Sequence, residues 1–119
     1  MSEVLLWLGV GVLGGVGALA RFLIDAMVSA RASGRFPTGT FIVNLTGAVG
    51  LGAITGLALH GDALLLAGTA VIGSYTTFST WLLETHRLSE DGELPLVVLN
   101  VAASLALGIG AAALGRWIA

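Results

Sequence analysis

The sequence predicts an all-α integral membrane protein with four transmembrane helices in a single domain, residues 1–119. Hydrophobic residues make up 56% of the chain and charged residues 10%, whereas a soluble domain carries about 25% charged residues. A small domain has a large surface for its volume, so this chain has too little charge to cover a surface in water. Its apolar residues also form four runs, each near the roughly 20 residues that a helix needs to cross a bilayer.

The four expected helices are separated by short polar gaps, so neighbouring helices are predicted to run antiparallel. They cover Val4–Ala26, Phe36–Leu59, Ala63–Leu88 and Leu94–Ile118. Glycine is frequent inside these runs, with 18 residues in the chain. Small residues let helix backbones approach closely in a membrane, which indicates packing faces within or between subunits. Four helices alone can hardly enclose a pore, so at least a dimer is expected.

The first helix carries two charges late in its apolar run. Arg21 and Asp25 are four residues apart and are expected to form an ion pair on one helix face. Charged side chains within a membrane usually face the bundle interior or water, which makes Arg21 a candidate functional residue. Alternatively, Arg21 extends to the membrane surface.

The second helix places Thr40 and Asn44 one turn apart on the same face. An asparagine in a spanning helix either joins two helices by hydrogen bonds or contacts a ligand. The sequence leaves both readings open.

The third helix contains a run of hydroxyl side chains at its centre. Every residue from Ser74 to Thr80 except Phe78 carries a hydroxyl. Such side chains compete for backbone hydrogen bonds, which predicts a break in the helix at mid-membrane. Irregular backbone at that depth is tolerated where it is buried or lines a polar cavity, and its free carbonyls can bind a cation. Ordinary interhelical hydrogen bonding is the alternative.

Phe78, Trp81 and Glu84 follow at intervals of three residues and are predicted to lie on one side of the third helix. Aromatic rings have a positive edge, so rings presented edge-on can contact an anion. The alternative is that both rings are ordinary core or lipid-facing side chains.

The fourth helix carries Asn100, Ser104 and Gly108 at intervals of four residues, which draws one polar or small stripe along it. Such a stripe is either a tight packing seam or one wall of a narrow polar path.

The charged residues exclude several functions and bear on orientation. The formal net charge of −2 and the lack of a polybasic patch argue against nucleic acid binding. No acid–base pair, nucleophilic triad or His/Cys cluster is evident, so no enzyme activity is expected. Arg31, Arg35 and Arg87 fall on one side of the membrane and Arg116 on the other. The positive-inside rule then predicts both termini outside, with a bias small enough for insertion in both orientations.

Three blocks of the sequence together resemble the Fluc/CrcB family of fluoride ion channels. They are Gly14–Arg21 (GGVGALAR), Pro37–Asn44 (PTGTFIVN) and Gly73–Thr80 (GSYTTFST). The second and third blocks are the specific ones, and the resemblance extends over nearly the whole chain.

The resemblance implies a cell-membrane channel made of two four-helix subunits in opposite orientations, a dual-topology homodimer. A pair of narrow fluoride paths and a structural sodium ion at the dimer interface are also implied. Some family members pair with a second, oppositely oriented chain instead. By position, Gly73 and Thr76 would offer backbone carbonyls to sodium.

The same resemblance assigns candidate residues to the fluoride path. Phe78 belongs to an aromatic pair whose second member is Trp81 here, where phenylalanine is usual. Asn100 takes a position that is tyrosine in some relatives, and Glu84 lies near the mouth. Other candidates are the polar and charged residues noted above for their depth in the membrane or their helix face. The expected path is then Arg21, Thr40, Asn44, Phe78, Ser79, Thr80, Trp81, Glu84, Asn100 and Ser104.

Two other readings remain. A small multidrug-resistance transporter, a cation/proton antiporter, has a similar size and antiparallel pairing but depends on an acidic residue inside its first helix. Val4–Ala20 contains no acid. A non-transporting membrane assembly subunit would explain the glycines but not the polar stripes.

Overall fold

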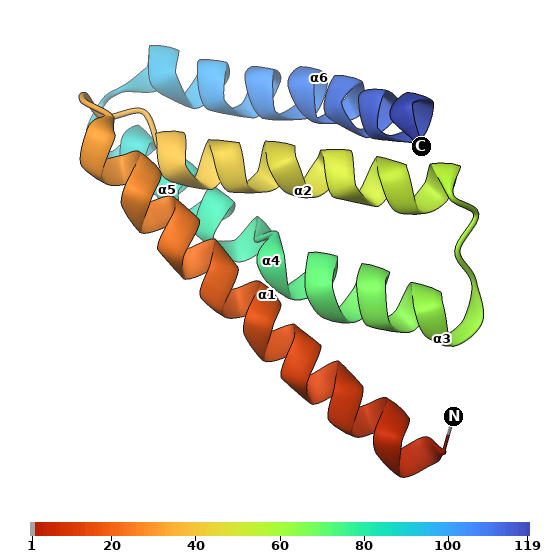
Figure 1. Cartoon of the computed structure of the whole chain (residues 1–119). Helices are drawn as coiled ribbons and strands as arrows, with labels where there is room; N and C mark the ends of the chain where they lie inside the picture. The colour runs from red at the N-terminus through yellow and green to blue at the C-terminus, as the bar shows by residue number, and fades with distance from the viewer. Residues whose placement is uncertain (1) are drawn as a thin grey trace.

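The computed structural model describes residues 2–119, and all the regular elements in this range are helical. Four segments are long and apolar enough to cross a membrane: α1 (Glu3–Arg31), α2 (Thr38–Gly56), the composite segment Gly61–Glu90, and α6 (Leu94–Ile118). Figure 1 shows that they alternate in direction, so that the N- and C-terminal ends of the chain lie on the same side. The predicted all-helical, four-span membrane fold is confirmed.

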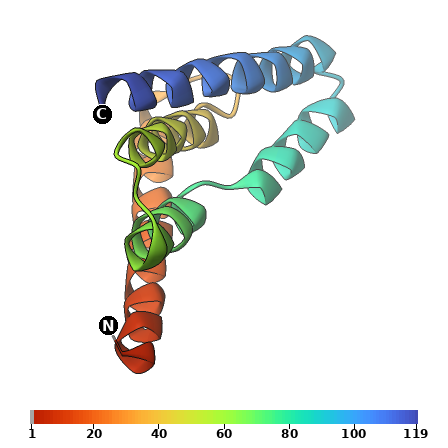
Figure 2. The same ribbon diagram turned by 90° about the vertical axis from the view of Figure 1, so that its right-hand side faces the viewer.

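The third span is broken, as its hydroxyl-rich centre predicts. It consists of α3 (Gly61–Leu64), the π-helical stretch η1 (Leu65–Ile72), α4 (Gly73–Tyr75) and α5 (Phe78–Glu90). Between α4 and α5 the backbone is extended, with φ/ψ of −78°/160° at Thr76 and −145°/120° at Thr77. Figure 2 shows that the chain is extended between the end of α4 and the beginning of α5.

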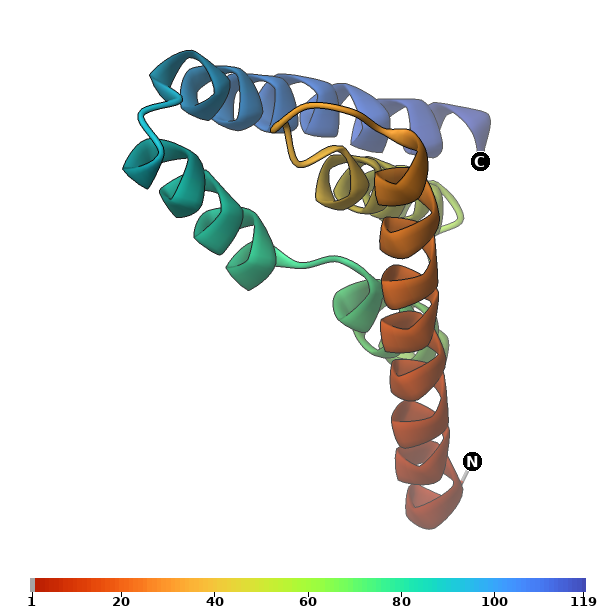
Figure 3. The ribbon, with the colours of Figure 1, turned by 90° about the vertical axis from the view of Figure 1, so that its left-hand side faces the viewer.

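The break allows the two halves of the third span to pack against different helices. The first half, η1 and α4, packs on α1, whereas α5 packs on α6. Figure 3 shows α5 turning away from α1 and running toward the beginning of α6. The most extensive contact is between α2 and α6, and α1 also packs on α2. The break therefore lies where α2 meets both halves of the third span.

The first helix is longer than its apolar run predicts. It continues from Ala26 to Arg31, because the last turns of a helix can leave the hydrocarbon region and still keep their backbone bonds. Arg31 lies in the last turn, where the helix dipole favours a positive charge. The second helix is shorter than predicted, beginning at Thr38 and ending at Gly56.

Few large side chains are buried within the protomer. Val43 and Asn100 are fully buried, whereas long apolar side chains such as Trp117 and Ile109 are 83% and 73% exposed. Contiguous apolar surface on this scale needs lipid or another protein to cover it. Together with the four spans, this surface identifies a multi-pass membrane protein.

Candidate functional site

The amide of Asn44 holds the broken backbone of the third span. Its Nδ2 donates to the Thr77 carbonyl and its Oδ1 accepts from the Thr77 N–H, both at 2.9 Å. The hydroxyl of Thr77 then caps α5 by accepting from the Thr80 N–H at 3.1 Å. Asn44 therefore supplies, from α2, the acceptor that the Thr77 N–H lacks at the break. It also adds a second donor to the carbonyl of Thr77, the N-cap residue of α5.

These hydrogen bonds also take from the carbonyls of Gly73 and Thr76 the N–H donors that a continuous helix would give them. In a continuous α-helix these carbonyls would accept from the N–H groups of Thr77 and Thr80, four residues later. Here those two N–H groups bond Asn44 and the Thr77 hydroxyl instead. The carbonyls predicted as cation ligands are thus the ones whose regular helical donors are diverted.

A groove of about 360 Å³ opens beside the break. Its polar lining includes Asn44, Thr76, Thr77 and Ser104, and Phe78 and Trp81 are its aromatic members. None of the described side chains that line it is charged. The rest of its lining is apolar: Gly47, Ala48, Leu51, Ile72 and Leu105. The predicted residues of α2, α5 and α6 therefore meet around one uncharged, largely apolar groove that contains a few hydrogen-bonding groups.

Phe78 and Trp81 lie on the same side of α5, as their spacing predicts. Their ring centroids are 5.6 Å apart and the planes are inclined by 43°. Phe78 is 70% exposed, whereas Trp81 is partly buried and donates its indole N–H to the Ser104 hydroxyl at 3.1 Å. The tryptophan thus adds to the groove a polar contact that phenylalanine cannot make.

A second cavity of about 170 Å³ lies on the other side of the break. It is lined by Arg21, Asp25, Thr40, Thr77 and Thr80, together with Phe22 and Val43. Thr77 borders both this cavity and the groove. The broken segment therefore borders two hollows. Of the predicted path residues, Arg21, Thr40 and Thr80 line this cavity, whereas Asn44, Phe78, Trp81 and Ser104 line the groove. Ser79 is exposed on α5 and lines neither hollow.

The predicted ion pair between Arg21 and Asp25 is wrong: within residues 2–119, no salt bridge joins them. The Asp25 carboxylate accepts from the Ser29 hydroxyl at 3.1 Å and lies against Gly39, where a side chain would overlap it. This position is near the N-terminus of α2, where the helix dipole favours a negative charge. Arg21 Nε is buried and has no hydrogen-bond partner among the described residues.

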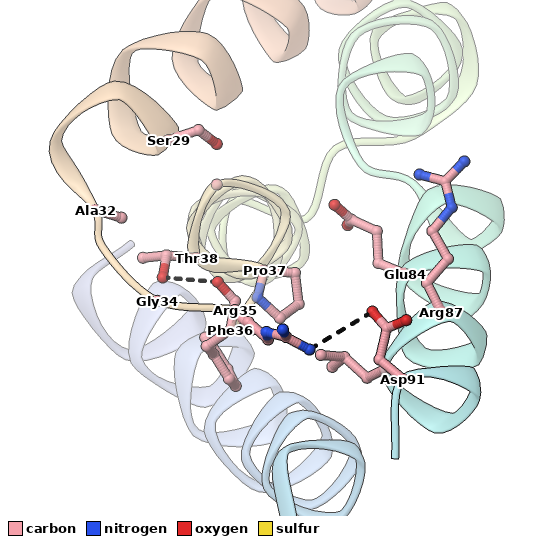
Figure 4. A pocket seen from close by; sticks show the side chains of 12 residues that line it. Ser29, Ala32, Gly34, Arg35, Phe36, Pro37, Thr38, Glu84, Arg87 and Asp91 are labelled. Carbon is pink, nitrogen blue, oxygen red and sulfur yellow. Dashed lines mark hydrogen bonds and ion pairs between the residues drawn. The ribbon is translucent and has the colours of Figure 1, made fainter. Parts of the chain in front are cut away.

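Glu84 does not line the groove with Phe78 and Trp81. A helix turns about 100° per residue, so six residues from Phe78 to Glu84 leave the two side chains about 120° apart. Glu84 instead lines a third pocket of about 380 Å³ at the Arg-rich end, with Arg35, Arg87 and Asp91. Figure 4 shows Glu84 and Arg87 on α5, and Asp91 directly after it, opposite the loop that holds Arg35.

This third pocket contains charges of both signs. Arg35 contacts Asp91 at 4.0 Å and Glu93 at 3.4 Å, as Figure 4 shows for Asp91. The Arg35 and Asp91 side chains are about 60% exposed, so these ion pairs stabilise the fold little. One carboxylate oxygen of Glu84 is buried without a hydrogen-bond partner in the described part of the chain.

Asn100 is fully buried between α5 and α6 and lies outside the groove. Its Nδ2 donates to the Thr85 hydroxyl at 2.9 Å, and its Oδ1 accepts from the Ser104 hydroxyl at 3.5 Å. Sequence reasoning missed Thr85, although its position one turn after Trp81 was a usable signal. It also missed Thr77 as the partner of Asn44, because that contact joins residues far apart in the sequence.

Comparison with known proteins gives the same family over the whole membrane domain. The family model described as "CrcB-like protein, Camphor Resistance (CrcB)" matches residues 8–116. Fluoride-specific ion channel FluC 2 of Mycobacterium tuberculosis H37Rv is 53% identical over 116 residues, 98% of this chain and 92% of the relative. FluC 1 of Symbiobacterium thermophilum is 42% identical over 115 residues, covering 92% and 93% of the two chains. The chain therefore belongs to the Fluc/CrcB family.

Proposed function

We propose that the chain is a subunit of a fluoride-selective ion channel that lets fluoride leave the cytoplasm by passive permeation. The observation that carries this proposal is the neutral groove beside the helix break. It gathers the Asn44 amide, the Ser104 hydroxyl and the Trp81 indole with the exposed Phe78 ring. The names of its relatives as fluoride-specific ion channels support the same ion.

Fluoride fits such a surface chemically. It is small and strongly hydrated, and it accepts hydrogen bonds but donates none. A selective path must replace its water by donors such as amide N–H, hydroxyls and ring edges. Conduction also requires binding that is weak enough for the ion to leave, which a charged side chain directly in the path would oppose. A neutral set of donors meets both requirements.

A cation/proton antiporter is the weaker alternative. Its mechanism requires an acidic residue in the transport path. The part of the groove that the structure describes contains no acid. The acids of α1 are Glu3 in its first turn and Asp25 near its end, which lines the second cavity and lies against Gly39. The geometry supports an anion path better than an organic-cation site.

We also propose a structural sodium ion at the dimer interface, held by the carbonyls of Gly73 and Thr76 from both subunits. Hard cations prefer oxygen ligands, and carbonyls at a break in a membrane helix are suitable ones. The fit rests on the diverted N–H groups of Thr77 and Thr80, which leave these two carbonyls without their regular helical donors. When bound, the ion would supply positive charge and join the two breaks.

The proposed assembly is a homodimer of oppositely oriented subunits, with a heterodimer of paralogous chains as the alternative. The large apolar surface of the protomer requires lipid or a partner. Relatives named FluC 1 and FluC 2 are consistent with paralogous chains. Three Arg residues at one end against Arg116 at the other give little preference for one orientation.

Reporter fusions at the C-terminus test this assembly. We expect activity from reporters that work only in the cytoplasm and from reporters that work only outside it, because both orientations are inserted. A signal from outside alone, with fluoride flux only after a second chain is co-expressed, would contradict the homodimer.

Substitution of Trp81 tests the aromatic edge. Trp81→Phe should conduct at a reduced rate, because it keeps a ring edge but loses the N–H that bonds Ser104. Trp81→Ile should lose roughly tenfold more flux, the effect of about 1.4 kcal/mol, because it removes the ring edge altogether. Fluoride-electrode measurements on purified variants give both rates. Equal flux in Trp81→Ile and the parent would exclude a role for the ring.

The direction of transport can be tested in cells. A bacterial strain without fluoride channels should grow in millimolar-range fluoride when it expresses this chain, and its internal fluoride should fall. The Trp81→Ile variant, expressed at the same level, is the matched control and should protect poorly. Unchanged internal fluoride with the parent chain would contradict export.

A further inference from the structure

Four side chains between α5 and α6 form a closed hydrogen-bond circuit: Trp81, Ser104, Asn100 and Thr85. The Trp81 indole N–H donates to Ser104 Oγ at 3.1 Å, and the Ser104 hydroxyl donates to Asn100 Oδ1 at 3.5 Å. Asn100 Nδ2 donates to Thr85 Oγ1 at 2.9 Å, and the Thr85 hydroxyl donates to the Trp81 carbonyl at 2.7 Å. All four donors therefore follow one direction around the circuit, which begins at the indole N–H of Trp81 and ends at its backbone carbonyl.

The four bonds differ in strength. Hydroxyl donors normally lie 2.5–3.0 Å from an oxygen acceptor, so the bond from Ser104 to Asn100 is the weak one. Meanwhile the indole N–H occupies a lone pair of the Ser104 oxygen and polarises its O–H group. The Ser104 proton is therefore the member of the circuit that another acceptor can take most easily.

The four side chains also differ in access. Ser104 and Trp81 line the groove, whereas Asn100 is 0% exposed and neither Asn100 nor Thr85 lines it. A fully buried amide needs partners for its oxygen and its nitrogen, and Ser104 and Thr85 supply them. Asn100 therefore cannot contact an ion in the groove directly, but it is hydrogen-bonded to Ser104, which lines the groove.

We infer that Asn100 and Thr85 are positioning residues that hold the Ser104 proton on Asn100 when the groove is empty and let it rotate to fluoride when the ion arrives. No covalent bond changes, since the hydroxyl only turns about its C–O bond. The Trp81 N–H fixes the oxygen throughout, which gives the indole a role that phenylalanine cannot fill. This inference rests on the proposed fluoride path and specifies how one of its donors is controlled.

Thr85→Val tests the circuit, with Thr55→Val as the matched control. Both hydroxyls donate to the carbonyl four residues earlier, Thr85 to Trp81 at 2.7 Å and Thr55 to Leu51 at 3.0 Å. Only Thr85 also accepts from a buried amide. We expect Thr85→Val to lower fluoride flux about tenfold, the effect of about one hydrogen bond, and Thr85→Ser to recover most of it. Thr55→Val should conduct like the parent.

A double-mutant cycle separates positioning from direct contact. Asn100→Leu should lower flux about tenfold in the parent but less than about twofold in Ser104→Ala, because the hydroxyl that Asn100 positions is absent there. The same fold-change in both backgrounds would overturn the inference, as would equal flux in Thr85→Val and Thr55→Val. If Asn100→Leu does not fold, Thr85→Val in the two backgrounds provides the cycle.

A spectroscopic readout keeps the inference separate from the proposed function. The indole ¹H–¹⁵N resonance of Trp81 is assigned by its loss in Trp81→Phe. It should move in Thr85→Val without any fluoride present, and in the parent it should move when fluoride is added. An unchanged resonance in Thr85→Val would exclude the circuit even if the protein conducts. If the resonance moves in Thr85→Val but the parent chain passes no fluoride, the hydrogen-bond circuit is supported and the proposed channel is contradicted.

Discussion

Asn44→Ala is expected to reduce fluoride flux by about 100-fold or more. The change removes two hydrogen bonds of 2.9 Å to the backbone of Thr77 and leaves its N–H and C=O without those partners. The Thr77 N–H then has no partner at the break, which costs about 1–3 kcal/mol, so the extended conformation loses much of its stability. Thr77 can then bond the Gly73 carbonyl and continue the helix, which would remove both the groove wall and a proposed sodium ligand.

Flux and thermal stability should be measured together on the purified Asn44→Ala protein. A backbone clamp predicts that the protein still folds but that both quantities fall, with the unfolding temperature lowered by several degrees. Thr55→Val, also on α2 and bonded only to its own helix, should change neither. A large loss of flux at an unchanged unfolding temperature would mean that Asn44 acts only as a donor to the ion.

Gly52→Ala is expected to have the largest effect on stability. A methyl group at Gly52 would overlap the carbonyl oxygen of Ala112 on α6, and one at Gly115 would overlap the carbonyl of Val49 on α2. The two helices therefore contact each other backbone to backbone at these glycines. A carbonyl cannot swing away as a side chain can, so the helices must separate, at a cost of about 1–3 kcal/mol or more.

Gly108→Ala is the matched control for this contact. Gly108 also lies on α6, and a methyl group there would meet nothing within 4 Å in the protomer. Thermal unfolding in detergent, followed by size-exclusion chromatography, should show a lower midpoint and less of the proposed dimer for Gly52→Ala only. Equal midpoints for the two variants would mean that the α2–α6 contact is looser than these distances indicate.

These glycines illustrate what the sequence could predict and what it could not. The number of spans follows from composition and run length, since only lipid can accommodate so much apolar surface. The break follows from the hydroxyl run at residues 74–80. Which glycines are at helix contacts does not follow, because Gly52 and Gly108 occur in similar apolar surroundings. That difference is set by the rotation of α6 against α2.

The candidate site was predicted by residue type better than by geometry. Asn44, Phe78, Trp81 and Ser104 do line one groove. The expected pairing of Arg21 with Asp25 fails because Asp25 faces Gly39. Glu84 lies in a different pocket from Phe78 and Trp81, because a three-residue interval drifts around a helix by about 60° at each step. The partner of Asn44 is a backbone group 33 residues away, which no local pattern reveals.

The most direct test of a passive fluoride path is ion efflux from liposomes that contain the purified protein. Vesicles are loaded with potassium fluoride or potassium chloride, diluted into an impermeant salt, and opened to potassium by valinomycin. Fluoride should leave rapidly and only after valinomycin is added, because the ion carries its charge without a coupled proton, and chloride should stay inside. Fluoride efflux that needs a proton gradient rather than valinomycin, or equal efflux of chloride, would contradict a fluoride-selective channel.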